Sequence, residues 1–261
     1  MSAHPPVTLA IRCRVQRYEF LLLWPVLLLV WQLLSACLPL GANPLIPSPQ
    51  VTARALWESL PELWQGTLSS MGILLPGFGL AVLLGTPLGL WAGARPRAGR
   101  IWLPFARVAA PVPPTVYIPY AIALLPGFLA SAIFVVFVGA FWPVFQSVVA
   151  GVHALDRRYL DNARMLELRG WQYGRLVLLP ATLPHLFSGM AVGLGFAFVL
   201  LTVAELFGAN AGLGHFVQYY ADFADYPKMV AGILYTGLVT FISMSLLDRL
   251  RRHLLFWGQH R

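Results

Sequence analysis

Six long apolar runs follow one another along the chain, at residues 20–40, 68–93, 101–125, 129–149, 183–207 and 229–247. Each is close to the roughly 20 apolar residues that a helix needs to cross the hydrocarbon core of a bilayer. The composition agrees, since 58% of the residues are hydrophobic and 11% are charged, whereas about a quarter of the residues in a soluble domain are charged. The sequence therefore predicts an all-α integral membrane protein with about six transmembrane helices, and it excludes a soluble globular protein.

The basic residues fall mostly on one side of these predicted spans. With the N-terminus in the cytoplasm, 16 of the 18 Lys and Arg residues are cytoplasmic, and only Arg54 and Lys228 lie outside. Because cytoplasmic loops are enriched in Lys and Arg, we expect a multi-pass protein with both termini in the cytoplasm. The expected organisation is a cytoplasmic N-terminal segment at 1–19, a single membrane domain at 20–250 that includes a polar cytoplasmic loop at 151–179, and a cytoplasmic tail at 251–261.

The first apolar run shares features with a secretory signal. Three arginines precede it, and Leu-Ser-Ala-Cys at 34–37 resembles a lipoprotein cleavage site. Its length, however, is that of a spanning helix rather than of a signal-peptide core. We therefore predict an uncleaved span and keep cleavage as the alternative.

The third apolar run is rich in proline, which breaks or kinks a helix. A broken helix persists at membrane depth where it faces protein or a water-filled path, so Pro113 and Pro114 are predicted to line a pathway. Glu205 is the one acidic residue inside an apolar run. An acid at membrane depth indicates a functional site, although Glu205 is close enough to the interface to cap the turn at 208–214 instead.

Motifs for chemistry are missing from the sequence. The one lysine, Lys228, is not in a phosphate-binding loop, and the six histidines form no His-Glu-x-x-His pattern. No Gly-x-Ser-x-Gly motif for a nucleophilic serine is present either. We therefore expect no catalytic residue, metal or cofactor in this chain. We also expect no nucleic-acid partner, because the arginines lie at the borders of apolar runs and not along one polar face. Any nucleotide hydrolysis is expected on another subunit.

The polar loop at 151–179 has the pattern of an amphipathic helix. Leu155, Tyr159, Ala163 and Leu166 recur at helical spacing, with charged residues between them. This pattern fits a helix that docks on a protein partner, and it also fits a helix on the membrane surface.

The stretch Tyr159–Leu166, followed by Trp171-Gln172 and by 177–184, resembles the EAA loop in permease subunits of bacterial ATP-binding cassette (ABC) importers. Pro113-Pro114, 139–143, 204–209 and 212–214 resemble the branch that imports aliphatic sulfonates, taurine and nitrate. The resemblance implies a type I importer permease fold in which the loop forms a cytoplasmic coupling helix that docks on the ATPase subunit. The implied docking residues are Tyr159, Leu160, Asp161, Asn162, Ala163, Arg164, Leu166, Glu167 and Gly170.

The same resemblance implies the partners and the location. It implies a second copy of the permease as a homodimer, two ATPase subunits that use ATP and Mg²⁺, an extracytoplasmic binding protein, and the lipid bilayer of the bacterial inner membrane. The chain itself would form the pathway for a small solute, with an anion such as an aliphatic sulfonate, taurine or nitrate favoured over bicarbonate or a pyrimidine-like molecule.

The loop departs from the family pattern at two places. The usual Glu-Ala-Ala reads Asp161-Asn162-Ala163, and the usual glycine reads Glu167, with the nearest glycine at Gly170. Since glycine provides the left-handed residue that ends such a helix, we expect the turn to move to residues 168–170.

Two other classes of protein remain open from the residues alone. A stand-alone secondary transporter would carry solute without an ATPase, driven by an ion gradient. A membrane enzyme would need clustered polar side chains at one depth, which the sequence does not offer.

Overall fold

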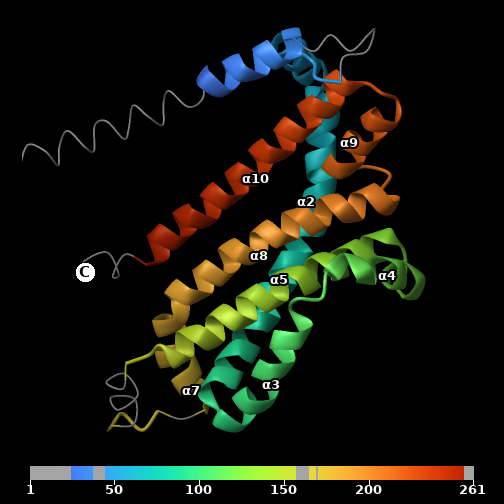
Figure 1. The fold of residues 1–261 in the computed structure, drawn as a ribbon. Coiled ribbons are helices and arrows are strands. Elements are labelled where there is room, and N and C mark those ends of the chain that lie inside the picture. Colours follow the sequence, from blue (N-terminus) through green and yellow to red (C-terminus); the bar gives the residue numbers. More distant parts are fainter. Residues whose placement is uncertain (1–24, 38–44, 157–164, 169, 256–261) are drawn as a thin grey trace, which may run out of the picture.

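The computed structural model describes residues 25–37, 45–156, 165–168 and 170–255, and all the regular structure in these ranges is helical (Figure 1). Of the predicted docking residues, Tyr159 to Arg164 lie outside the described residues. The helices are Pro25–Cys37, α2 (Pro49–Ala94), α3 (Pro96–Ala109), the short 3₁₀ helix η1 (Pro114–Tyr117), α4 (Ile118–Leu124), α5 (Phe128–His153), α7 (Gly170–Tyr173), the π-helical η2 (Gly174–Leu178), α8 (Leu179–Gly208), α9 (Leu213–Asp222) and α10 (Tyr226–Leu254).

Four helices in the described ranges are long and apolar enough to cross a membrane. They are α2, α5, the continuous stretch Gly170–Gly208 that contains α8, and α10, and they cover the second, fourth, fifth and sixth predicted spans. In the first predicted span, the structure describes the helix Pro25–Cys37. The structure therefore shows four of the about six predicted spans as long apolar helices, and it has shorter apolar helices in the other two runs.

The third apolar run is divided into α3, η1 and α4, with a break before Pro114. Pro113 is extended, with φ −60° and ψ 120°, because a residue before proline is kept out of the helical region. The break lies where the prolines of the sequence predicted it.

Helix α2 is longer than predicted. It runs without interruption for 46 residues and includes Pro61, Pro76 and Pro87, so the residues before the second predicted span belong to the same helix. Ser48 caps its first turn, because the Ser48 side chain accepts a hydrogen bond from the Val51 N–H.

Helices α2 and α5 run parallel and pack through glycines. A Cβ added at Gly77 would lie 2.8 Å from Val136 Cγ1, and one added at Gly93 would lie 2.7 Å from Val152 Cβ. Small residues at four-residue spacing therefore allow close helix packing here. The same register pairs Gly85 with Val144 and Gly89 with Val148.

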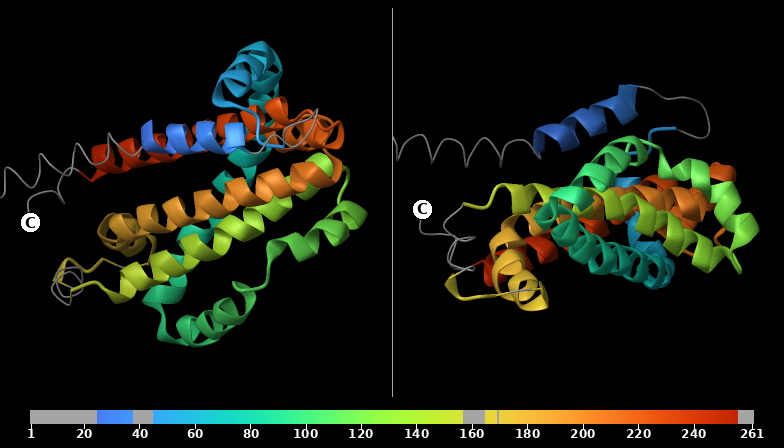
Figure 2. Two further views of the ribbon diagram at one scale, coloured as in Figure 1. Left: turned by 45° about the horizontal axis from the view of Figure 1, so that its top comes forward. Right: turned by 90° about the horizontal axis from the view of Figure 1, so that it is seen from below.

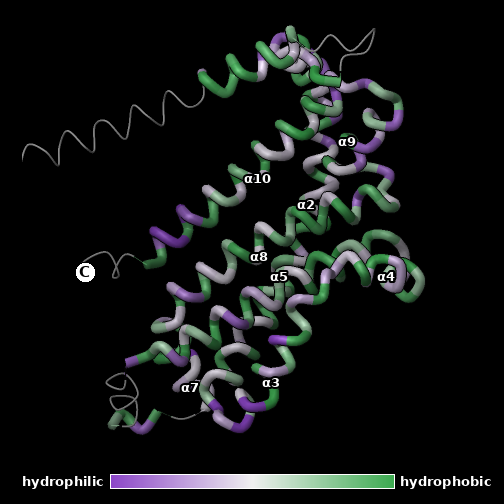
Figure 3. Tube along the Cα trace, in the orientation of Figure 1, coloured by the Kyte–Doolittle hydropathy of each residue, from purple (hydrophilic) through white to green (hydrophobic). Residues whose placement is uncertain are grey.

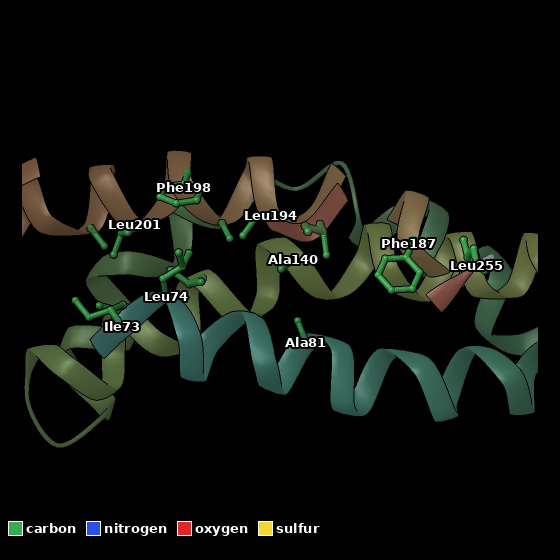
Figure 4. Close-up of a cluster of buried hydrophobic side chains, with 14 residues drawn as sticks. Ile73, Leu74, Ala81, Ala140, Phe187, Leu194, Phe198, Leu201 and Leu255 are labelled. Carbon is green, nitrogen blue, oxygen red and sulfur yellow. The ribbon is translucent and has the colours of Figure 1, made fainter. Parts of the chain in front are cut away.

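Helix α8 runs antiparallel to α5 and lies beside it (Figure 2). Gly151 of α5 faces His185 near the start of α8, and Gly193 of α8 faces Ala140 in the middle of α5. Side chains of α2, α5, α8 and α10 form the main apolar core, which includes Ile73, Leu74, Ala81, Ala140, Phe187, Leu194, Phe198, Leu201 and Leu255 (Figure 4).

The directions of these helices define two ends of the molecule. At the α7 end, α2 and α5 end and α8 begins, and Leu255 after α10 packs in the same cluster as Phe187. At the α9 end, α8 ends and α10 begins. Hydrophilic segments gather towards both ends (Figure 3). The basic residues of α3, η2 and the last turns of α10 lie at the α7 end, whereas Glu58, Glu62, Asp222 and Asp225 belong to elements of the α9 end.

Candidate functional site

Glu205 lies near the end of α8, and its carboxylate is enclosed between three helices. The residue is 1% exposed. Glu205 Oε1 accepts a hydrogen bond of 2.5 Å from the Ser70 hydroxyl of α2, and Oε2 accepts one of 2.6 Å from the Gly214 N–H of α9. Ser70 Oγ in turn accepts a 2.9 Å hydrogen bond from the Leu213 N–H. We call Ser70, Glu205, Gly212, Leu213 and Gly214 the Glu205 junction.

The Glu205 junction supplies acceptors to the first turn of α9. The first N–H groups of a helix have no partner within the helix, and a carboxylate is favoured at this positive end of the helix dipole. Gly212 precedes α9 with φ +142°, and a Cβ there would lie 2.5 Å from the Glu205 carboxyl carbon. Glycine is therefore required at this position by its backbone conformation and by the space that the carboxylate occupies.

The turn from α9 to α10 carries a second group of polar contacts. The Tyr220 hydroxyl donates a 2.9 Å hydrogen bond to Glu62 of α2, and Lys228 lies over the Tyr220 ring and 3.7 Å from Asp225. Burial and the hydrogen bond to Glu62 raise the pKa of Tyr220 to about 12. The phenol therefore stays protonated and remains a donor at neutral pH.

A cavity of about 420 Å³ lies beside the break in the third apolar run. Pro114, from the start of η1, is part of its wall, whereas Pro113 and Glu205 are not. Of the three predicted pathway residues, only Pro114 therefore lines this cavity. The complete lining is Ala110, Pro111, Pro114, Gly139, Trp142, Pro143, Gln146, Ser147, Val192 and Phe196.

The described part of the polar loop at 151–179 exposes apolar side chains. Leu166 is 70% exposed, Trp171 is 76% exposed, and the neighbouring Met165 is 83% exposed. Glu167 has φ +52° and Gly170 has φ +56°. The expected displacement of the turn to 168–170 is therefore wrong in one respect, because Glu167 itself adopts the left-handed conformation and Gly170 adds a second one.

Two features of these sites were not predicted from the sequence. Ser70 is 135 residues from its partner Glu205, and no local pattern connects them. Gln146 and Ser147 form a polar pair inside an apolar run, which is a visible signal, but the wall opposite them comes from α8. Within the described residues, no three His, Cys, Asp or Glu side chains gather in a way that could hold a metal ion.

The long apolar helices, with one broken apolar run beside a cavity, are those expected of a membrane-embedded protein. The chain belongs to the family of binding-protein-dependent transport system inner membrane components, whose model matches residues 85–255. This match confirms the resemblance to permease subunits of ABC importers.

Several known proteins are similar to the chain over most of its length. The nitrate import permease protein NrtB of Synechocystis sp. is 29% identical over 86% of this chain and 82% of its own. The taurine transport system permease protein TauC of Escherichia coli is 30% identical over 89% of this chain and 86% of its own. In the inward-facing MetNI methionine ABC transporter, one chain superposes with a TM-score of 0.62 at 18% identity, covering 77% of this chain and 98% of that one.

Family membership settles the class of protein. The chain is a non-catalytic component of the inner membrane that works with a binding protein, and it carries no cofactor of its own. The interpretation as a membrane enzyme is therefore excluded.

Proposed function

We propose that the chain is the permease subunit of an ATP-driven importer and that two copies enclose the pathway for a small solute. The observation that carries this proposal is the sequence similarity to importer permeases, which extends over most of the chain. Two ATPase subunits would bind at one face of the membrane and an extracytoplasmic binding protein at the other. Closure of the ATPase subunits would rock the spans between inward-facing and outward-facing states.

The α7 end is the proposed cytoplasmic face and the site of ATPase docking. It carries the basic residues of α3, η2 and α10, which favours this orientation by the distribution of Lys and Arg. Met165, Leu166 and Trp171 are exposed there, and buried apolar contacts with a charged rim are typical of a protein interface. The proposed docking set is Tyr159, Leu160, Asp161, Asn162, Ala163, Arg164, Leu166, Glu167 and Gly170.

The solute is proposed to be a small molecule with an anionic group, such as the aliphatic sulfonates, taurine or nitrate that the relatives are named for. Pro114 is proposed to belong to the pathway wall because it lines the cavity, and Pro113 because it lies at the same break in the chain. Glu205 is proposed to act on the pathway indirectly, by holding α9 against α2 and α8, because its carboxylate is enclosed by hydrogen-bond donors.

The docking assignment is tested by Ala163→Trp in proteoliposomes that contain the chain, its ATPase and its binding protein. A bulky side chain on the docking ridge is expected to abolish ATP hydrolysis stimulated by the loaded binding protein, while membrane insertion is unchanged. Gly237→Trp is the matched control, since nothing lies within 4 Å of a Cβ at this exposed position of α10. Coupling that survives Ala163→Trp would show that the ridge does not dock.

The same proteoliposomes separate an importer from a secondary transporter. Without the ATPase, we expect no uptake under an ion gradient. Uptake by the chain alone would overturn the proposed function.

A further inference from the structure

The cavity beside the broken run has room for a molecule of modest size. Its volume of about 420 Å³ falls within the roughly 300–1,000 Å³ of sites that bind small organic ligands. One side of the wall is Ala110, Pro111 and Pro114, where the chain passes from α3 to η1 (Figure 1). The other sides are the middle of α5 and the facing residues Val192 and Phe196 of α8.

Most of the lining side chains are apolar, and none of them is charged. Polar groups come from Trp142, Gln146 and Ser147, all on α5. Pro143 has no N–H to donate to the carbonyl of Gly139, one turn before it, and both residues line the cavity. The cavity therefore combines a broad apolar surface with a few neutral hydrogen-bonding groups.

Gln146 has hydrogen-bonding capacity left for a ligand. Within the described residues, the one hydrogen bond of its side chain is a long contact of 3.4 Å from Nε2 to the Ala106 carbonyl. Its side chain is exposed although it lies inside an apolar span. A polar side chain at membrane depth faces protein or a water-filled cavity rather than lipid, so we expect the amide to face water, protein or a solute and not a lipid tail.

We propose that this cavity is a transit site for a small organic solute that has one polar head and a short hydrocarbon part, in preference to a bare inorganic anion. The proposal rests on the proposed function and selects a substrate class within it. Any anionic head would exchange its water for a wall that is mostly apolar and has no cation, and a bare inorganic anion has no hydrocarbon part to offset this cost. A hydrocarbon part instead gains about fourfold in affinity for each methylene that the wall covers.

The neutral lining also suits a site that must release its solute. A site on a transport pathway has to bind strongly enough to admit the solute and weakly enough to let it leave. An amide, a hydroxyl and an indole N–H bind an anionic head without the strength of a full ion pair. Selection would then come from the size and the apolar surface of the cavity.

The test measures binding to the assembled permease and ATPase in lipid nanodiscs, without the binding protein, whose own selectivity would otherwise contribute. The probes are straight-chain alkanesulfonates of increasing length, sodium nitrate and sodium bicarbonate, measured by calorimetric titration. We expect affinity to rise about fourfold with each added methylene. Both inorganic anions are expected to bind about tenfold or more weakly than the longest probe that fits.

Two matched pairs of variants locate the binding. Val192→Trp fills the cavity and is expected to weaken alkanesulfonate binding about tenfold, whereas Val199→Trp, at an exposed position two turns further along α8 and outside the lining, leaves it unchanged. Gln146→Leu is expected to weaken binding about fivefold without altering the dependence on chain length. Gln218→Leu, in α9 and hydrogen-bonded to Asp222, is its control.

The proposal is overturned if affinity is independent of chain length, if nitrate binds as well as the alkanesulfonates, if the cavity variants have no effect, or if no probe binds. ATP-dependent uptake by the same wild-type preparation, once its binding protein is added, would show that the proposed function stands while the cavity assignment fails. Uptake that proceeds without ATP would instead count against the proposed function.

Discussion

The Glu205 junction and the loop before α7 both contain a residue with left-handed backbone, but they accommodate it differently. In the junction this residue is Gly212, and the neighbouring donors are satisfied by Glu205 and Ser70 of the same chain. In the loop it is Glu167, next to the exposed Leu166. The junction is complete within one chain, whereas the loop leaves apolar surface and backbone strain at a place where a partner is proposed to bind.

The comparison implies that changes to the junction affect stability and that changes to the loop affect coupling. Glycine at a left-handed position avoids the cost of about 1–2 kcal/mol that other residues incur there. The Glu167 loop retains this cost, and binding to a partner would have to hold the conformation. Three substitutions test this division, in order of decreasing effect.

Glu205→Leu is expected to have the largest effect. It leaves the Gly214 N–H and the Ser70 hydroxyl without their acceptor, at about 1–3 kcal/mol for each buried unsatisfied group. A fall in Tm of roughly 5–15 °C is expected for the purified protein in detergent. Glu58→Leu is the control, since Glu58 forms an exposed pair with Arg54 at 3.0 Å, and such pairs contribute at most about 1 kcal/mol. Equal shifts for the two variants would contradict the role of the junction.

Gly212→Ala is expected to destabilise the protein by about 2–3 kcal/mol, because the new Cβ is strained and meets the Glu205 carboxyl group. Gly79→Ala in α2 is the matched control, since a Cβ there meets nothing within 4 Å. In a helix interior this change stabilises by about 0.5–1 kcal/mol. The two substitutions should therefore shift Tm in opposite directions, and a shift in the same direction would count against the close approach at Gly212.

Glu167→Gly is expected to have the smallest effect on the stability of the protein, and it should stabilise the loop. Removing the cost of the left-handed backbone should stabilise the folded conformation of the loop at 165–170 by about 1 kcal/mol. The expected result is slower amide hydrogen exchange in the loop and stronger stimulation of the ATPase. Glu167→Ala keeps the backbone cost and removes the charge. If the alanine variant matches the glycine variant, the charge of Glu167 rather than its backbone is responsible.

Much of the fold could be predicted from the apolar runs. Each of the four long spans covers its predicted apolar run and extends beyond it, most of all at the start of α2, because a helix in a membrane must satisfy its own backbone and so includes the apolar run. The break in the third run followed from its prolines. The length of α2 was missed, since a proline such as Pro61 can be accommodated within a helix rather than ending it.

The sites were less predictable, because their residues are distant in sequence. The sequence marks Glu205 as unusual because it is an acid inside an apolar run. Whether it lines a pathway or caps a turn depends on its contacts with Ser70 and α9, which the sequence does not show. The cavity depends on how α8 faces α5, and neither helix alone indicates it. The docking residues Tyr159 to Arg164 remain a prediction from resemblance, since they lie outside the described residues.

The glycine and valine pairing of α2 and α5 also limits how these two helices can move. A pattern that repeats every four residues would normally let one helix slide by a full turn and find equivalent partners. Here the series is interrupted once on each helix, where Ala81 replaces glycine and meets Ala140 in place of valine (Figure 4). A slide of one turn would press the Ala81 methyl against Val136 or Val144. The contact between Ala81 and Ala140 therefore fixes the register of α2 against α5. Helices α2 and α5 should then travel as one rigid rod.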